Sequence, residues 1–323
     1  MHQGGYTLYR CPFCNKNTLV TNKQEDSFSC FSCGRTGKIS EERKIVIEKE
    51  EIQEDKTFLD IYEKSAIFYY LNLKEYQEAT DYLKKRNIKE ADIDEFGLGY
   101  APHGSKLYQE LSKEFSDEQL MSSGLFRRGE DGTLYDFFRN RIMFPIFNSK
   151  GNVVAFGGRV LDDSKPKYLN SSENLYFSKR KLLYGFPYEE EPQSDTILIC
   201  EGYMDLIAAK KAGIRDSAAV LGTALTKDHV KTIIGKYKKV LLGFDSDEAG
   251  MNAIKRSLSE LKAYGLKASI PNYKPAKDPD EYLQLFGSTA LIKRLSEATC
   301  ASRFIAEHGT ASELLDILTS NPE

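Results

Sequence analysis

The sequence predicts a multidomain protein that combines α/β and α+β architecture. Two Cys-x2-Cys pairs stand in the first forty residues, basic residues gather in the middle of the chain, and strand-like runs alternate with helical runs from Asp195 onward. This alternation is typical of a parallel sheet covered by helices on both faces. A chain of 323 residues is long enough for roughly two or three domains, at least one of them with a substantial core.

The first domain is predicted from cysteine spacing. Two pairs, separated by fifteen residues, are formed by Cys11, Cys14, Cys30 and Cys33. In a chain without a recognisable secretion signal, this spacing favours zinc over disulfides. We expect a zinc ribbon over residues 1–40 with one structural Zn²⁺, because so small a unit buries little core and needs the metal to fold. The charged segment over residues 41–56 is expected to be a linker.

Residues 57–193 are predicted to form a mixed α/β subdomain with a basic surface. Apolar and aromatic residues recur at helical spacing from Phe58 to Tyr70 and are expected to be core residues. Between Arg127 and Lys181 there are eleven Lys or Arg and six Asp or Glu, a local net charge of +5 in a chain whose net charge is −3. Such a local field suits a polyanionic substrate. Further helices are expected over 77–86, 89–96, 106–115 and 117–122, and a β-hairpin over 139–147 and 152–156.

Residues 194–275 carry the alternating pattern of a parallel sheet, and residues 276–323 are expected to be a short helical segment. Strands are predicted over 196–200, 217–221, 240–244 and 267–270. The crossover helices are predicted over 203–212, 227–236 and 250–264. Ligands of such sheets bind beyond the carboxyl ends of the strands.

Acidic residues stand at those strand ends. Glu201 follows the first strand, and Asp245 and Asp247 follow the third. Carboxylates that converge at one sheet edge repel one another unless a cation binds, and Mg²⁺ prefers oxygen ligands of this kind. Asp247 could instead cap the next helix, and the later cluster Asp278-Pro279-Asp280 could be a helix start whose acids complement the dipole. The pattern points to metal-dependent phosphoryl-transfer chemistry.

The composition is that of a globular protein, with 41% hydrophobic and 29% charged residues. No apolar run approaches the roughly 20 residues that span a bilayer, and the N-terminus lacks the apolar stretch of a signal peptide. We expect a cytoplasmic monomer that does not associate with membranes.

The acidic motifs resemble, in their order, the Toprim domain, which primases, topoisomerases and some nucleases share. The matching segments are Glu201-Gly202-Tyr203-Met204-Asp205, Leu221–Ala224, Gly243–Gly250 and Asp278-Pro279-Asp280. Upstream segments are similar to the bacterial replicative primases of the DnaG type, namely Asn140–Ile146, Gly151–Leu161, Pro166–Ser171 and Tyr176–Lys179. The cysteine pairs stand where that family keeps its zinc ribbon, and the resemblance covers about residues 6–285.

This resemblance implies a DNA primase, a DNA-directed RNA polymerase of the nucleotidyltransferase class. Such an enzyme synthesises short RNA primers on single-stranded DNA for replication, from ribonucleoside triphosphates and with catalytic Mg²⁺ or Mn²⁺. The expected central metal ligands are Glu201, Asp245 and Asp247. Outer or additional ligands are expected to be Asp205, Asp278 and Asp280.

The resemblance also implies contacts to substrate and partners. Candidates for contacts to the triphosphate and the template backbone are Arg141, Arg159, Lys167 and Lys179. Tyr168 and Asn170 are candidates for placing a nucleotide. A replicative helicase of the primosome is the implied protein partner.

The sequence departs from the family pattern at two points. Cys14 stands where the family usually has a histidine, but four thiolates still suit tetrahedral zinc. Only about forty residues follow Asp280, where the family usually continues into a helicase-binding domain. We therefore expect that domain to be absent, as in a phage or mobile-element enzyme acting in the host cytoplasm, or in a truncated chain.

Two other functions use the same features. A Toprim-type nuclease or topoisomerase-related enzyme would cleave DNA with these acids, although a topoisomerase needs a tyrosine nucleophile on a further domain, for which this chain is too short. A non-catalytic single-stranded DNA-binding protein with a zinc ribbon would be expected to lack the acids, yet all are present.

Overall fold

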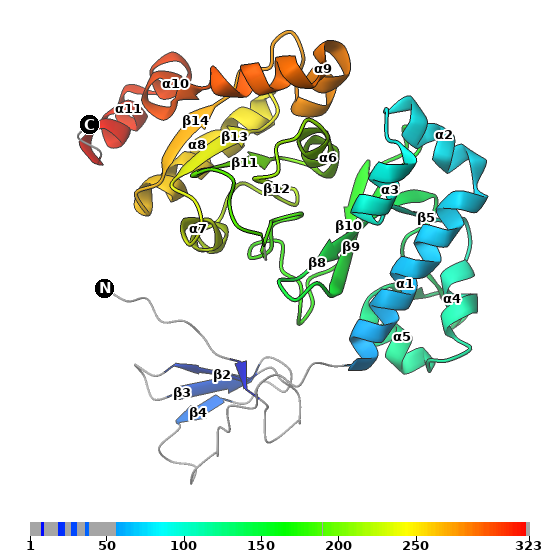
Figure 1. The fold of residues 1–323 in the computed structure, drawn as a ribbon. Helices are drawn as coiled ribbons and strands as arrows, with labels where there is room; N and C mark the ends of the chain where they lie inside the picture. The colour runs from blue at the N-terminus through cyan, green and yellow to red at the C-terminus, as the bar shows by residue number, and fades with distance from the viewer. Residues whose placement is uncertain are drawn as a thin grey trace. The chain divides into compact units, whose positions relative to one another are not determined.

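The computed structural model describes residues 56–188 and 190–320, with side chains up to residue 315, and the backbone of four short strands before them. The chain divides into two compact units, Met1–Asp55 and Lys56–Glu323 (Figure 1).

The first unit contains an antiparallel sheet in the order β1-β2-β3-β4. Its strands are β1 (Leu8–Tyr9), β2 (Leu19–Asn22), β3 (Ser27–Cys30) and β4 (Thr36–Lys38). Cys30 ends β3, but its side chain and the residues Cys11, Cys14 and Cys33 lie outside the described part of the chain, as does the linker up to residue 55. The zinc site therefore stays a prediction.

The second unit begins with helices that pack on an antiparallel sheet. The helices are α1 (Lys56–Glu75), α2 (Gln77–Lys85), α3 (Glu90–Phe96), α4 (Lys106–Leu111) and α5 (Asp117–Ser123). Phe58, Tyr62 and Tyr69 of α1 are core residues, as predicted, and Tyr62 stacks on Phe156 with ring centroids 5.5 Å apart. Tyr70, also expected in the core, is only half-buried, and its hydroxyl donates to the Asp94 carboxylate. The helix predicted over 106–115 is shorter, and α4 begins where the Asp136 carboxylate accepts from the N–H groups of Leu107 and Tyr108.

The sheet beneath these helices has the order β10-β9-β8-β5. Its strands are β5 (Gly99–Ala101), β8 (Arg141–Phe147), β9 (Val153–Val160) and β10 (Tyr168–Asn170). The predicted hairpin is confirmed, because β8 pairs with β9 and the Asn148 carboxamide oxygen accepts from the N–H groups of Lys150 and Asn152 in the turn. A separate hairpin joins β6 (Phe126–Arg128) to β7 (Leu134–Asp136).

The C-terminal half forms a five-stranded sheet in the order β12-β11-β13-β14-β15. The strands are β11 (Thr196–Cys200), β12 (Ser217–Ala219), β13 (Lys239–Gly243), β14 (Lys267–Ile270) and β15 (Thr299–Cys300). The first four are parallel, as predicted, whereas β15 pairs antiparallel with β14 at the edge. The two-residue strand β15 is too short to leave a period in the sequence.

Helices cover both faces of this sheet. They are α6 (Tyr203–Lys211), α7 (Lys227–Ile234), α8 (Glu248–Ala263), α9 (Pro279–Ser296), α10 (Ala301–His308) and α11 (Ala311–Ser320). Because neighbouring residues of a strand point to opposite faces, Leu198 packs with α6 and α9, and Ile199 packs with α7 and α8.

Helix α6 lies between the two sheets (Figure 1). Its buried residues share one core with Phe144 of β8 and Leu198 of β11. Tyr203 stacks on Phe144, with centroids 4.7 Å apart, and a Cβ added at Gly157 would lie 2.3 Å from the Tyr203 ring. Gly157 therefore lets α6 approach the antiparallel sheet.

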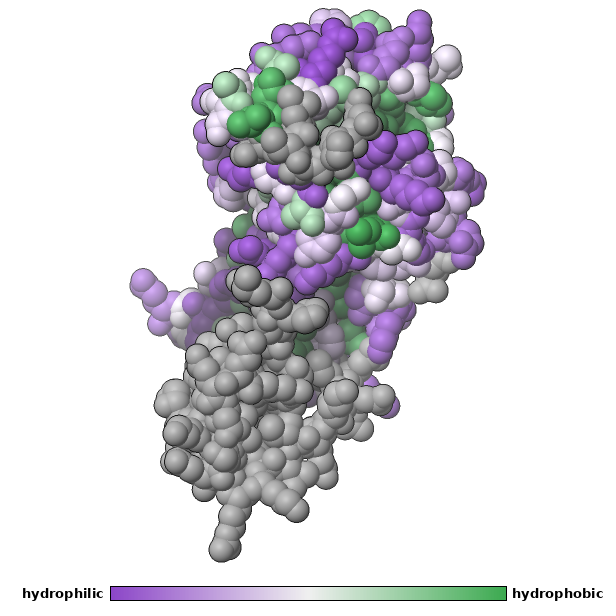
Figure 2. All heavy atoms as spheres, turned by 90° about the vertical axis from the view of Figure 1, so that its left-hand side faces the viewer, coloured by the Kyte–Doolittle hydropathy of each residue, from purple (hydrophilic) through white to green (hydrophobic). Residues whose placement is uncertain are grey.

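The described part of the surface seen in Figure 2 is mostly polar. Figure 2 shows that hydrophilic residues predominate on the described part of one face, interrupted by small hydrophobic groups. Within residues 56–188 and 190–320, no helix combines the length and the apolar character needed to cross a bilayer.

Candidate active site

Two acidic motifs meet at the carboxyl ends of neighbouring parallel strands. Cys200, the last residue of β11, is in register with Gly243, the last residue of β13. Glu201 and Asp245 therefore leave the sheet at the same edge, and the Asp245 N–H donates to Oε2 of Glu201 at 3.2 Å. The chain turns sharply after Asp245 because α8 begins against it, and a Cβ at Gly250 would lie 2.1 Å from the Asp245 carbonyl oxygen.

Two helix starts complete the acid cluster, which we define as Glu201, Asp205, Asp245, Asp278 and Asp280. Asp205 lies in the first turn of α6, and Asp278 is the N-cap of α9, where it accepts from the Glu281 N–H at 2.7 Å. One carboxylate oxygen each of Asp205, Asp245 and Asp278 lies within 4.8 Å of the other two. Three separate segments thus converge on one small volume.

Burial and repulsion between neighbouring carboxylates raise pKa values in the acid cluster. Burial, together with the charges of Glu201, Asp278 and Asp247, raises the pKa of Asp245 to about 7. Burial and the charges of Asp278, Asp245 and Asp280 raise the pKa of Asp205 well above its ordinary value. Burial also raises the pKa of Glu201. Such mutual repulsion between hard oxygen donors is relieved by a divalent cation, so these residues fit Mg²⁺ or Mn²⁺.

A group of cations, the basic cluster, borders the acids and consists of Arg86, Arg159, Lys167 and Lys277. Burial lowers the pKa of Lys167, and the charges of Arg159, Lys277 and Arg86 lower it further. Arg86 contacts Asp280, with Nη1 3.2 Å from Oδ2. The Arg159 guanidinium lies over the rings of Tyr82 and Tyr168, 5.8 and 5.1 Å from their centroids. Four cations gathered beside carboxylates are suited to an anionic ligand held next to a metal.

Two family models match most of the second unit, one on each side of residue 194. Residues 67–190 match the family model of the DNA primase catalytic core, N-terminal domain, and residues 198–283 match a Toprim-like model. A DNA primase of Clostridium acetobutylicum is 35% identical over 319 residues, 89% of this chain and 53% of that protein. The chain thus spans about half the length of this relative.

Solved structures agree with the family models. A structure described as the DnaG primase catalytic domain bound to ssDNA superposes with a TM-score of 0.71 at 30% identity, covering 81% of this chain and 87% of that one. The Aquifex aeolicus primase, described as zinc-binding and RNA polymerase domains, superposes with a TM-score of 0.73 at 28% identity, covering 99% and 85%. The chain belongs to the DnaG-type DNA primases.

In this primase core, Asp247 lies beside the acid cluster with a different set of contacts. It is exposed and caps α8, since its Oδ1 accepts from the Gly250 N–H at 2.8 Å. Its charge nevertheless raises the pKa of Glu201 and Asp245. The helix-cap role considered from the sequence and a contribution to the field of the cluster thus coexist.

The six predicted nucleotide- and template-binding residues of the primase divide by position. Arg159 and Lys167 belong to the basic cluster, and Tyr168 lies under Arg159. Arg141 is buried and donates to the carbonyl oxygens of Gly158 and Pro166 at 3.3 and 3.0 Å, so it holds the loop that carries Lys167.

Asn170 and Lys179 have other surroundings. The Asn170 carboxamide oxygen accepts from the Tyr203 hydroxyl at 2.6 Å, and its Nδ2 donates to the Leu221 carbonyl oxygen at 3.4 Å. It thereby joins β10 to α6. Lys179 lies in the segment after Phe177, where its N–H donates to the Glu173 carboxylate.

Two members of the basic cluster were not predicted from the sequence. Lys277 directly precedes the Asp278-Pro279-Asp280 motif, and this proximity is a signal that could have indicated it. Arg86 follows Lys84 and Lys85 at the end of α2, and nothing in the local pattern separates it from them. Only the fold brings it to Asp280, 194 residues away.

Proposed function

We propose that this chain is the catalytic part of a DNA primase, which joins ribonucleotides into short RNA primers on a single-stranded DNA template. The observation that carries the proposal is the convergence of Asp205, Asp245 and Asp278 beside the basic cluster. Membership in the primase family also supports this activity, whose chemical step is nucleotidyl transfer. The attacking 3′-hydroxyl forms a bond to the α-phosphate of the incoming nucleotide, and pyrophosphate leaves.

The acid cluster would hold the divalent cation, either Mg²⁺ or Mn²⁺. The geometry favours Asp205, Asp245 and Asp278 as ligands, and Glu201, Asp247 and Asp280 as surrounding acids. The sequence alone predicted a different set of central metal ligands, namely Glu201, Asp245 and Asp247. When bound, such a cation neutralises negative charge on the phosphoryl oxygens and the leaving group.

The remaining residues bind, orient and accept protons. The basic cluster would bind the triphosphate of the incoming ribonucleotide, with Arg141 and Asn170 positioning the segments that present Lys167 and Tyr168. The carboxylate of Glu201, whose pKa is raised by burial, is suited to accept the proton of the attacking hydroxyl. Holding the reacting groups in line removes much of the entropic part of the barrier.

The template and the partners are proposed from the relatives. One neighbouring structure is described with bound ssDNA, and another with zinc-binding and RNA polymerase domains. By analogy we propose that residues 1–40 bind Zn²⁺ through four cysteines and contact the template. Residues 41–56 would link this domain to the catalytic core. The core would consist of a basic subdomain (57–193), the Toprim domain (194–275) and a C-terminal helical segment (276–323). A replicative helicase is the proposed protein partner.

Primer synthesis on an undefined template tests the function directly. The protein is incubated with single-stranded DNA, labelled ribonucleoside triphosphates and Mg²⁺, and the products are separated by size. We expect short, template-dependent RNA, and a loss of about 100-fold or more in Asp245→Ala, since removal of a charge-stabilising group typically costs this much.

The control is Asp228→Asn, which removes a carboxylate on α7 that pairs with Lys231, outside the acid cluster, and should leave synthesis intact. Nicking of the DNA without RNA synthesis would instead establish a Toprim-type nuclease. Template binding without either reaction would establish a non-catalytic DNA-binding protein.

A further inference from the structure

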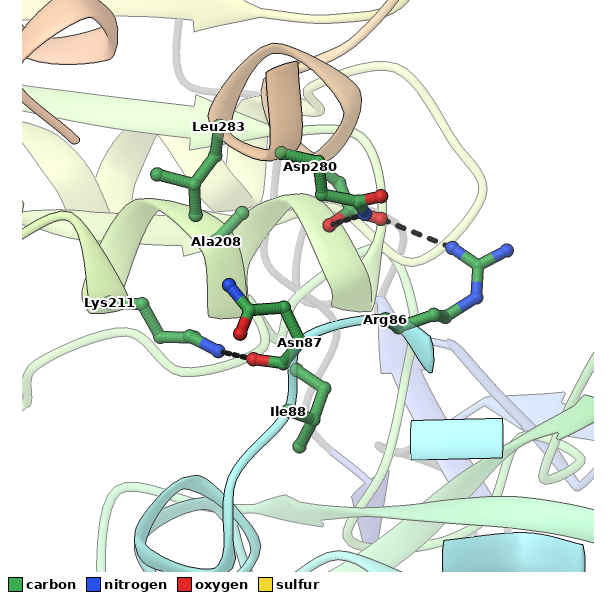
Figure 3. A pocket seen from close by; sticks show the side chains of 8 residues that line it. Arg86, Asn87, Ile88, Ala208, Lys211, Asp280 and Leu283 are labelled. Carbon is green, nitrogen blue, oxygen red and sulfur yellow. Dashed lines mark hydrogen bonds and ion pairs between the residues drawn. The ribbon is translucent and has the colours of Figure 1, made fainter. Parts of the chain in front are cut away.

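The turn between α2 and α3 is fastened to the rest of the core at two points (Figure 3). At one point Arg86 contacts Asp280, the acid at the start of α9. At the other, Nζ of Lys211, on α6, lies 2.8 Å from Oδ2 of Asp92. Ile88 and the α9 residue Leu283 line the small pocket between these contacts.

The contact made by Lys211 is partly shielded from water. Its side chain is 14% exposed and that of Asp92 is 13% exposed. The same ammonium donates to the carbonyl oxygen of Asn87. Removing one partner of a partly buried ion pair leaves an uncompensated charge, so this contact contributes more than the exposed pairs of the surface.

The conformation of the turn links the contact made by Lys211 to the position of Arg86. Asn87 has φ 56°, in the left-handed region, so the chain reverses direction immediately after Arg86. Holding the Asn87 carbonyl therefore fixes where the neighbouring Arg86 side chain leaves the backbone. Helix α6 carries Asp205 at its start and Lys211 at its end, so one rigid helix sets both an acid of the cluster and the turn of Arg86.

We propose that Lys211 is a positioning residue, which holds the Asn87–Asp92 turn so that Arg86 stays beside the acid cluster and contacts the substrate triphosphate. The inference rests on the proposed function and deepens it. Lys211 itself touches neither substrate nor metal. Its removal should therefore weaken binding of the triphosphate and leave the chemical step unchanged.

The test combines Lys211→Met, which keeps the aliphatic stem, with Lys211→Arg, which keeps the charge. In primer synthesis we expect Lys211→Met to raise KM for the ribonucleoside triphosphate about tenfold, with kcat within about twofold, the pattern of a lost binding contact. Lys211→Arg should stay within about twofold of the wild type. Lys231→Met, which breaks an exposed pair on α7, should change nothing.

The double variant Lys211→Met/Arg86→Gln shows whether Lys211 acts through Arg86. We expect it to have the same KM as Arg86→Gln alone, because residues that act through one another are not additive. Full additivity would overturn the proposal, as would a wild-type KM in Lys211→Met or an equal defect in Lys211→Arg. If Lys211→Met does not fold, Asp92→Asn removes the same pair from the other side.

A binding measurement separates this proposal from the proposed function. Calorimetric titration with Mg²⁺ and ATP, without template, should show about tenfold weaker binding in Lys211→Met, matching the expected change in KM. If the wild type makes no primer, the proposed function fails, and the ATP affinity of the variants then decides alone whether Lys211 positions Arg86. Unchanged ATP affinity would overturn the positioning role.

Discussion

Asp245 is held in a place where its charge is unfavourable without a cation. An acid whose folded pKa exceeds its unfolded pKa contributes stability at low pH and loses it as pH rises. The pKa of Asp245 rises from its ordinary 3.8 to about 7 in the fold, so the loss of stability develops between these two pH values. We expect Asp245→Asn to raise the melting temperature of the metal-free protein at pH 8, by ~2–4 °C for each kcal/mol of relieved repulsion.

The same variant should show no such gain at pH 4, where the wild-type carboxyl is protonated in the folded protein. Differential scanning fluorimetry in the presence of a chelator measures both values. Asp228→Asn is the matched control and should shift neither. An equal gain at both pH values would contradict the assigned repulsion and indicate a packing effect.

Gly157 is a residue whose lack of a side chain sets the distance between two layers. A Cβ there would lie 2.3 Å from the ring of Tyr203. We expect Gly157→Ala to lower the free energy of unfolding by about 1–3 kcal/mol, the usual cost of overpacking, as measured by urea denaturation. Gly235→Ala is the control, since its nearest neighbour would be the Thr232 carbonyl oxygen at 3.9 Å, and a loss of the same size there would contradict the explanation.

At the scale of elements, α7 depends on a neutral histidine. His229 is buried, and the Thr226 N–H donates to its Nδ1 at 3.3 Å at the helix start. Burial lowers the pKa of His229 from 6.5 to about 4. The unfolded chain therefore binds this proton first, and stability falls as pH decreases from 6.5 towards 4.

We expect His229→Gln, which offers a carboxamide oxygen as acceptor in place of Nδ1, to remove this part of the pH dependence. The difference in unfolding free energy between pH 7.5 and pH 5 should shrink by about 2 kcal/mol relative to the wild type, measured by urea denaturation at each pH. Asp136, whose pKa is raised to about 6, changes stability with pH in the opposite direction. Its contribution is the same in the wild type and in His229→Gln, so it cancels in the comparison. An unchanged pH dependence would show that His229 is already charged in the fold.

Elements were predictable wherever a local pattern determined them. Strand β11 was predicted over its whole length, because the apolar run Ile197–Cys200, buried on both faces, has few alternatives. The acids at the strand ends followed from the same reasoning. The local pattern did indicate a helix start at Asp278-Pro279-Asp280. It gave no signal that this helix lies close to Asp245, so the approach of α9 to β13 could not be predicted from it. Arg86 was missed for the same reason, because its role comes only from tertiary structure.

At the scale of the whole molecule, we expect the two compact units to bind different metals, zinc in the first and Mg²⁺ or Mn²⁺ in the second. Because the second unit contains the described hydrophobic cores, removal of zinc should not unfold it. We expect Cys14→Ser to lower the zinc content from roughly one ion per chain, as a closed four-ligand site requires, while the main melting transition stays in place. Zinc content is measured by atomic absorption, with Cys300→Ser as the control. A main transition lowered along with the zinc content would show that the units are interdependent.

The position of α6 has a consequence for protein engineering. Separate family models describe the residues on either side of the loop near residue 194, which invites the use of each part as an independent module. Yet α6 contributes to one core with both sheets, so a cut in this loop would leave each fragment with a large apolar face open to water. Fragments cut there should be recovered folded only when they are produced together, and this Toprim region could be grafted onto another protein only after that face had been redesigned.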